Sequence, residues 1–131
     1  MKKRVIVIIS MVLVMGLMIS VAYAENPETG TIGSVSYEFS NAISSTKRSA
    51  NAKTHTSSIN AVATANATFY WVDYDAHTFG SSYKHASNYG NAEVYADPTG
   101  NTAKYYYQVV SYHSASYDGT TVSKTITTFV P

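Results

Sequence analysis

The sequence predicts an all-β protein, a small antiparallel β-sandwich preceded by a cleaved signal peptide helix. Beyond residue 24 the chain contains no Leu, Met or Cys and is rich in Ser, Thr, Tyr and Val, which favour strands over helices. Apolar and polar residues often alternate there, and no stretch shows the period of about 3.6 residues of a helix. Asp118-Gly119, between two alternating stretches, is a strong signal for a β-hairpin.

The first 24 residues are typical of a secretory signal peptide. Residues 2–4 are basic, residues 5–21 are apolar, and Ala-Tyr-Ala at 22–24 is a small-residue cleavage site. The apolar run also approaches the ~18–20 residues that span a bilayer, so a retained membrane anchor is the alternative. The cleavage site and the polar sequence after it favour removal of the peptide, and we expect a secreted, extracellular protein.

Cleavage after Ala24 would leave 107 residues, enough for one domain, which we place at residues 31–131. Six Lys and Arg would then face eight Asp and Glu, a formal net charge of −2. This balance excludes nucleic acid as a partner, and we expect no stable membrane insertion after cleavage. The absence of Cys excludes disulfides and a lipid-anchored lipoprotein.

The N-terminal part of the domain is expected to contain one strand between two irregular segments. Residues 25–30 are polar, with a Pro and a Gly, and are interpreted as a disordered lead-in. Residues 31–39 alternate loosely and are interpreted as the first strand. Residues 41–52 are polar and of low complexity, so we expect a mobile loop there.

A long alternating stretch follows from Lys53. Ala61, Ala63, Ala65, Ala67, Phe69 and Trp71 fall on one face of an extended strand. A face of alanines lets a second sheet approach closely. Because the stretch exceeds the usual ~5–6 residues of a strand, we expect a bend or bulge near Asn66.

Three strands and a large irregular region are expected in the rest of the chain. Residues 73–91 are interpreted as irregular, with one short strand at 82–85. Residues 91–96 form a strand that enters a type I turn at 97–100, closed by a left-handed Gly100. Residues 102–117 and 120–130 form a hairpin and, with 91–96, a three-stranded antiparallel meander.

The hairpin fixes a register for its two strands. If Tyr117 lies opposite Thr120, four apolar or small pairs fall on one face of the hairpin. These pairs are Tyr117–Thr120, Ala115–Val122, Ser111–Ile126 and Tyr107–Val130.

Catalytic and metal-binding chemistry finds little support. An extended strand would place Asp73, Asp75 and His77 on one face, and His85 lies nearby in sequence, so a metal site is geometrically possible. A polar loop beside an aromatic strand explains these residues better. No nucleophile motif such as G-x-S-x-G is present, and we expect no enzyme, metal or cofactor. His113 would lie opposite Lys124, which favours exposure to solvent for both.

Tyrosines and Trp71 gather in two segments of the sequence. Tyr70, Trp71 and Tyr74 lie in the first, and Tyr105, Tyr106, Tyr107, Tyr112 and Tyr117 in the second. A tyrosine combines an apolar ring with a polar tip, which suits contact surfaces, but alternation turns about half of these rings into the core. Packing is therefore expected for any single ring, and a contact surface for the exposed set.

Two groups of short motifs resemble the lactococcin-972-like bacteriocins. Residues 53–59, Lys-Thr-His-Thr-Ser-Ser-Ile, are similar to an early Lys-Thr-His-Ser segment of that family. Residues 91–96 and 101–107, which end in three tyrosines, are similar to its late strand pair. The resemblance covers residues 34–107. The family's Trp/Gly-rich opening is absent, residues 69–79 look inserted, and the chain continues through residues 109–131.

The resemblance implies a secreted antibacterial protein that acts on cell-wall assembly in related bacteria. Its partner would be a cell-wall precursor or wall glycan. The candidate binding residues are Tyr105, Tyr106, Tyr107, Trp71 and His55. A secreted adhesive domain that binds wall glycan or a surface protein through exposed tyrosines is the main alternative, and an inhibitor or immunity-type domain is another.

Overall fold

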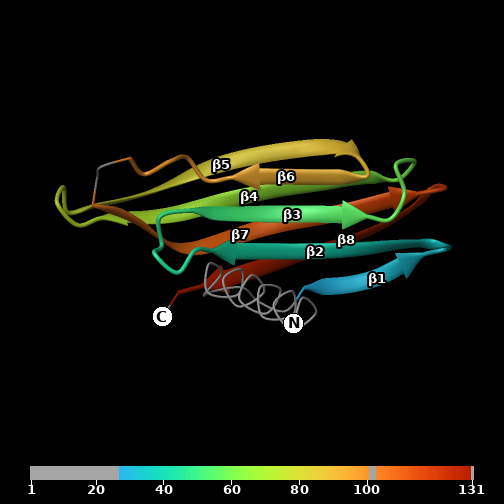
Figure 1. Ribbon diagram of the computed structural model, residues 1–131, viewed down its shortest axis with the longest axis horizontal. Coiled ribbons are helices and arrows are strands. Elements are labelled where there is room, and N and C mark those ends of the chain that lie inside the picture. The colour runs from blue at the N-terminus through green and yellow to red at the C-terminus, as the bar shows by residue number, and fades with distance from the viewer. Residues whose placement is uncertain (1–26, 101–102, 131) are drawn as a thin grey trace, which may run out of the picture.

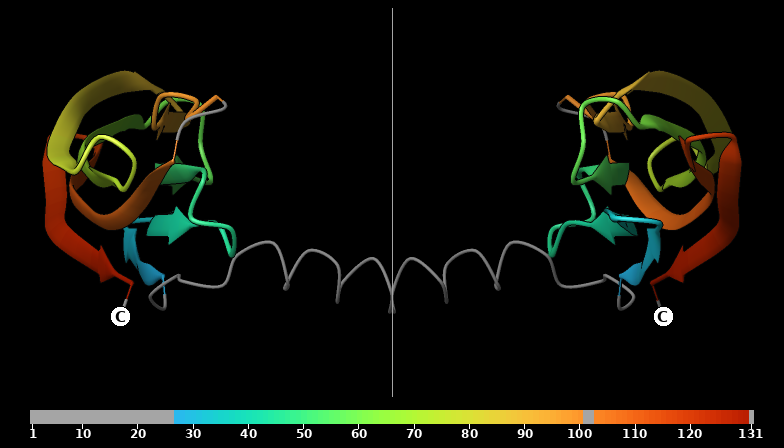
Figure 2. Two further views of the ribbon diagram at one scale, coloured as in Figure 1. Left: turned by 90° about the vertical axis from the view of Figure 1, so that its left-hand side faces the viewer. Right: turned by 90° about the vertical axis from the view of Figure 1, so that its right-hand side faces the viewer.

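Two four-stranded antiparallel sheets pack face to face in the computed structural model, which describes residues 27–100 and 103–130 (Figure 1). Sheet A has the order β1-β2-β3-β6 and sheet B the order β5-β4-β7-β8. The strands are β1 (Glu28–Ile32), β2 (Val35–Ile43), β3 (Ala50–Thr56), β4 (Val62–Asp73), β5 (Thr78–Tyr89), β6 (Asn91–Tyr95), β7 (Lys104–Tyr117) and β8 (Thr120–Phe129). An end-on view shows the two layers (Figure 2). The prediction of an antiparallel all-β fold is confirmed, and the predicted signal peptide, residues 1–24, lies outside the described residues.

Small side chains let the sheets approach closely at their centre. Ala63, Ala65 and Ala67 of β4 are buried and share one core cluster with Ala50 and Ala52 of β3. Nearby, Thr54 Oγ1 of sheet A donates a 2.7 Å hydrogen bond to the Thr64 carbonyl of sheet B. A side chain as short as threonine therefore reaches the backbone of the opposite sheet, as the alanine face of β4 predicts.

The N-terminal predictions need three corrections. The lead-in is too long, because β1 begins at Glu28. The strand expected at 31–39 is really a hairpin, since the chain turns at Gly33-Ser34 with a φ of 58° at Gly33 and pairs Ile32 with Val35. The mobile loop expected at 41–52 shrinks to the link between Ile43 and Ala50. Small and polar residues form part of β1, β2 and β3 because side chains of the opposite sheet cover them. Local composition does not show this effect.

The middle of the chain also differs from prediction. A twelve-residue strand, β5, pairs along the whole of β4 after a turn at residues 74–77, where an irregular region was expected. Its inward positions, Gly80, Ser82, Lys84, Ala86 and Asn88, give no hydrophobic alternation, so backbone pairing with β4 defines the strand. The expected bulge near Asn66 of β4 is absent from this described strand; the register between β4 and β7 shifts instead opposite Tyr70 and Trp71, where β7 has one extra residue.

The C-terminal hairpin is confirmed, whereas the meander is wrong. Tyr117 lies opposite Thr120, and Asp118 and Gly119 have φ angles of 49° and 77°, as a type I′ turn requires. β6, however, pairs with β3 in sheet A and not with β7. The chain changes sheet between these two strands, and Gly100 in that connection has the expected positive φ.

An ion pair closes each long side of the sandwich. Lys84 of edge strand β5 contacts Asp97 at 2.6 Å, and Lys124 of edge strand β8 contacts Glu28 at 2.9 Å. Both lysines occupy inward-facing positions on their strands, opposite Ala67 and His113. Inward-pointing charges on edge strands disfavour pairing with another chain.

Within the described ranges, the structure contains no helix long and apolar enough to cross a membrane.

Candidate functional site

Aromatic rings gather at the end of sheet B near the β4–β5 turn. Tyr70 and Tyr107 have ring centroids 6.4 Å apart, Tyr107 and Phe129 6.3 Å, and Tyr74 and Tyr105 5.6 Å. We call these five residues the aromatic cluster. Such separations are typical of favourable ring contacts. The cluster joins three neighbouring strands of sheet B and the turn after β4.

A groove of about 520 Å³ opens beside the aromatic cluster. It is lined by Val72, Asp73, Tyr74, His77, Phe79 and Tyr107. Apolar and aromatic side chains form most of its wall. Such a groove suits a ligand that offers an apolar face together with a few polar groups.

A β-bulge decides which of the three consecutive tyrosines reaches this surface. Tyr70 pairs with Gln108 but Trp71 pairs with Tyr106, so Tyr107 is the extra residue. The bulge turns Tyr107 outward. The Tyr106 N–H donates to the Lys47 carbonyl at 2.8 Å, across the sandwich.

Tyr106 belongs to the core. Its side chain is 0% exposed, and its hydroxyl donates to the Asp97 carbonyl at 2.6 Å. Burial raises the pKa of the Tyr106 phenol. Tyr106 is therefore removed from the candidate ligand contacts, whereas Tyr105 and Tyr107 stay half-exposed.

Trp71 is half-buried at the end of the interior, where it packs against the main core cluster. Its ring covers Gly80, its partner on β5. Lys104 Nζ lies 4.0 Å from the centre of the ring, a cation–π contact. The sequence placed Trp71 with the binding residues, but these contacts give it a packing role.

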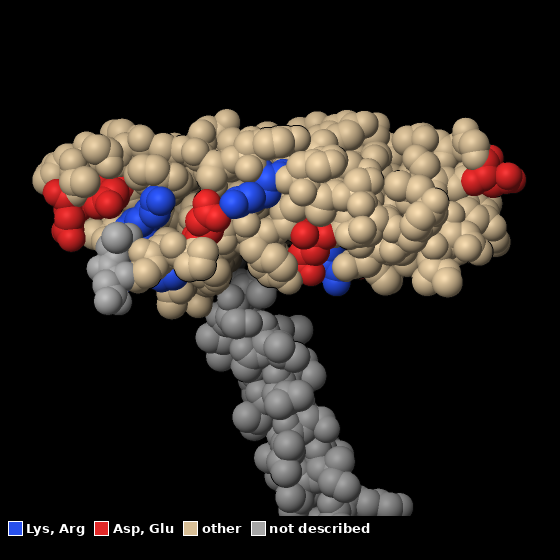
Figure 3. Space-filling view, turned by 90° about the horizontal axis from the view of Figure 1, so that it is seen from above, with Lys and Arg blue, Asp and Glu red and all other residues tan. Residues whose placement is uncertain are grey.

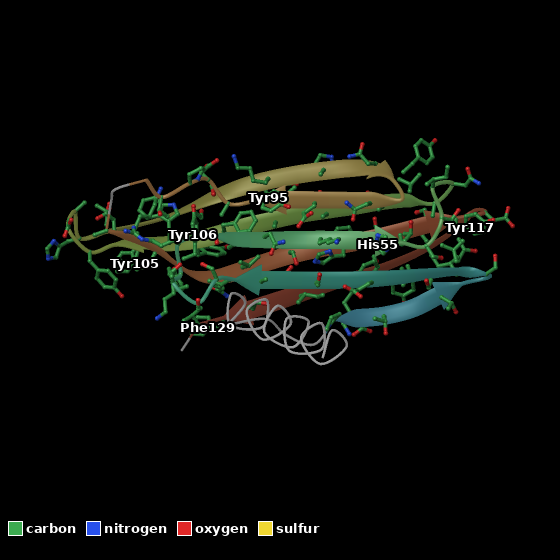
Figure 4. The ribbon with its side chains drawn as sticks, viewed as in Figure 1. His55, Tyr95, Tyr105, Tyr106, Tyr117 and Phe129 are labelled. Atoms are coloured by element: carbon green, nitrogen blue, oxygen red, sulfur yellow. The ribbon has the colours of Figure 1, made fainter. Side chains whose placement is uncertain are left out.

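His55 lies far from Tyr105 and Tyr107 (Figure 4). It is exposed on the outer face of sheet A, toward the opposite end of the molecule from Tyr105 (Figure 4). There it borders a second groove of about 350 Å³ with the exposed side chains of Ile59 and Tyr89. The structure therefore brings Tyr105 and Tyr107 together and leaves His55 at a separate place.

The outer face of sheet B has no Lys, Arg, Asp or Glu at its strand positions. The outward residues of β4 and β5 are Val62, Thr64, Asn66, Thr68, Tyr70, Val72, Phe79, Ser81, Tyr83, His85, Ser87 and Tyr89. Those of β7 and β8 are Tyr105, Tyr107, Gln108, Val110, Tyr112, Ser114, Ser116, Thr121, Ser123, Thr125, Thr127 and Phe129. We call this surface the uncharged face.

The outer face of sheet A differs, because it carries Glu38, Lys53 and Glu93. Seen from the β5 and β6 edge, the visible charges lie toward sheet A and at the two ends, and the border formed by sheet B is tan (Figure 3). The prediction missed Phe79, Tyr83 and Tyr89 of the uncharged face. They are separated by four and six residues, both even numbers, so an extended strand would place them on one face; this was the signal that could have found them.

Asp73, Asp75 and His77 do not share the face of a strand. Asp73 ends β4, and its carboxylate accepts the backbone N–H groups of Asp75 and Ala76 at 3.1 and 3.0 Å. The chain therefore turns, with His77 at a φ of 51°. Among residues 27–100 and 103–130, no three His, Cys, Asp or Glu side chains are placed to hold a metal.

A polar cluster is sealed between the sheets around His113. Thr54 Oγ1 lies 2.9 Å from His113 Nδ1, and Ser111 Oγ lies 2.6 Å from Nε2. Ser111 donates to Asn41 Oδ1 at 2.5 Å, and Asn41 donates to the Ile126 carbonyl at 3.1 Å.

The expectation that His113 faces solvent is wrong, although its register opposite Lys124 is right. His113 is 0% exposed, and burial lowers its pKa to about 4. Ser111 is 1% exposed, so a substrate cannot reach this serine–histidine pair.

Comparison of the chain with protein-family models, with curated proteins and with solved structures found no match.

Proposed function

We propose that the mature protein is a secreted, non-enzymatic antibacterial protein that binds cell-wall material of related bacteria and interferes with wall assembly. The observation that carries this proposal is the aromatic cluster with its groove, set on the uncharged face. The resemblance of residues 53–59, 91–96 and 101–107 to bacteriocins supports the antibacterial part of the proposal.

The chemistry of the surface supports a glycan or a glycan-containing precursor as the ligand. Sugar rings have apolar C–H faces that stack on aromatic rings, and Tyr70, Tyr107 and Phe129 offer such rings side by side. Sugar hydroxyls both donate and accept hydrogen bonds, as the Ser, Thr and Asn side chains of the same face do. The formal net charge of −2 without the leader gives no attraction to anionic lipid.

An adhesive wall-binding domain is the second candidate. The observation that favours it is that exposed aromatic side chains extend beyond the groove, to Tyr83, Tyr89 and Tyr112. A broad surface of this kind can hold a cell or a wall polymer without inhibiting growth. Growth inhibition therefore separates the two functions, since both require binding.

The test combines binding and growth assays on the purified chain without residues 1–24. We expect it to sediment with purified walls of related Gram-positive cells, to slow their growth at micromolar concentration, and to leave protein-free liposomes intact. Tyr107→Ala should weaken both binding and inhibition about tenfold, because it removes the central ring of the cluster.

Tyr95→Ala is the matched control, because Tyr95 is 62% exposed and lies on sheet A. It should leave both activities unchanged, with circular dichroism showing that both variants keep the fold. Wall binding without inhibition across a panel of strains would favour the adhesive domain. Absence of binding to walls would refute both functions.

A further inference from the structure

The uncharged face differs in composition from every other long surface of the sandwich. Sheet A, the β4–β5 turn and the two sides of the sandwich carry charged residues, whereas the strand positions of this face carry none. We infer that this face binds one neutral polysaccharide chain along its length, rather than an anionic polymer held at the groove alone. This inference rests on the proposed wall-binding function and names its ligand class.

Charge complementarity excludes a polyanion. An anionic polymer is held by Lys and Arg, but the ammonium groups of Lys84 and Lys124 point to the sides of the sandwich and pair with carboxylates there. Lys104 lies over the Trp71 ring, on the inner side of sheet B. Arg48 lies against the Tyr105 ring, at one end of the face.

Polar side chains of the face contact one another at three places. Thr64 and Ser87 hydroxyls lie 3.0 Å apart, those of Ser116 and Thr121 lie 2.7 Å apart, and His85 contacts Asn66. A hydroxyl that donates to its neighbour still has lone pairs free to accept a proton from a sugar. The face thus offers hydroxyl groups between its aromatic rings and carries no Lys, Arg, Asp or Glu at its strand positions.

The dimensions of the face suit a polymer. β5 is twelve residues long, which at about 3.3 Å per residue gives roughly 40 Å. Phe79, Tyr83 and Tyr89 are 77%, 63% and 72% exposed along this strand. By the same rise, the first and last of them lie about 33 Å apart. One chain can therefore contact several rings, and its weak contacts add because they are linked.

The test introduces opposite charges at the centre of the face. Thr68 lies on β4 between Val110 of β7 and Tyr83 of β5. Thr68→Lys and Thr68→Glu should both weaken binding, each about tenfold, because either charge must lose water beneath a neutral ligand. An anionic ligand would instead bind Thr68→Lys more tightly than the parent, which would overturn the inference.

The control pair is Thr29→Lys and Thr29→Glu, on the exposed outer face of edge strand β1 in sheet A, which should bind as the parent does. If a Thr68 variant fails to fold, the same charges at Thr125, exposed on β8, replace it. Binding is measured by sedimentation with purified walls before and after extraction of their anionic polymers, and with chitin as a neutral probe.

We expect parent binding to survive the extraction, to extend to chitin and to change less than twofold between 50 and 500 mM NaCl. Loss of binding after extraction would overturn the neutral ligand while leaving the proposed function standing. Failure to bind any wall preparation would refute the function itself. Sedimentation of the pure protein as a dimer that Thr68→Glu dissociates would assign the face to a second copy instead.

Discussion

Mild acid should destabilise this protein through His113. The imidazole is buried in the interior, where it stacks on Phe39 with ring centroids 5.5 Å apart. Lys124 lies opposite His113 in the register, and its ammonium group pairs with Glu28. Burial lowers the pKa of His113 to about 4 from 6.5.

The sign and size of the effect follow from proton linkage. Well above pH 6.5 the imidazole is neutral in both the folded and the unfolded chain, so His113 protonation does not lower the free energy of unfolding. Between pH 6.5 and 4 the unfolded chain binds the proton more tightly, and the free energy of unfolding falls as the pH falls. With a pKa of about 4 in the folded state, the free energy of unfolding falls by about 2 kcal/mol between pH 7.5 and 5. The total decrease is about 3 kcal/mol once the pH lies well below 4.

Urea denaturation at pH 7.5, 6.5, 5.5 and 5.0, followed by tryptophan fluorescence, measures this loss. The measurements stop at pH 5.0, because Asp and Glu titrate mainly below this pH. His113→Gln removes the titrating group and should flatten the dependence on pH, even if the variant is less stable throughout. His55→Gln, at an exposed histidine, should keep the parental slope. A parental slope in His113→Gln would refute the assignment of the pH dependence to the buried ring.

Three further predictions concern the fold and the N-terminus. Gly119→Val should destabilise the protein by about 1–3 kcal/mol, because a β-branched residue resists a φ of 77°; a thermal melt equal to the parent's would contradict the turn. Gly80→Val should cost about 1–3 kcal/mol, because its side chain would overlap the Trp71 ring, and an unchanged urea midpoint would show that the ring moves freely. Secreted protein should begin at Glu25 by intact mass, and recovery of only the full-length chain from membranes would contradict secretion.

The sequence alone was sufficient where the local signal and the final environment agree. Asp118-Gly119 requires two residues with positive φ, which Asp and Gly can adopt, and the hairpin register followed from that turn. The alanine face of β4 was visible because each inward residue is small and apolar. Both features depend on residues close together in the chain.

The candidate site was predictable only in part. The predicted register placed Tyr107 on one face with Ser111 and Ala115. The bulge opposite Tyr70 and Trp71 instead sends Tyr107 outward and Tyr106 into the core. A bulge adds one residue to one strand and exchanges the faces beyond it, and no composition signal marked its position.

Sheet membership and burial were decided by tertiary structure. β6 follows β5 in sequence but pairs with β3. Either sheet could satisfy its backbone hydrogen bonds, so the packing of Ala92 and Val94 in the core decides that β6 joins sheet A. The register places His113 opposite Lys124, as expected for a surface residue, yet in the interior its two ring nitrogens contact the hydroxyls of Thr54 and Ser111. The sequence thus determined which segments form strands and turns, whereas contacts between distant residues decided which side chains face solvent. Buried polar groups need hydrogen-bond partners, and only those contacts supply them.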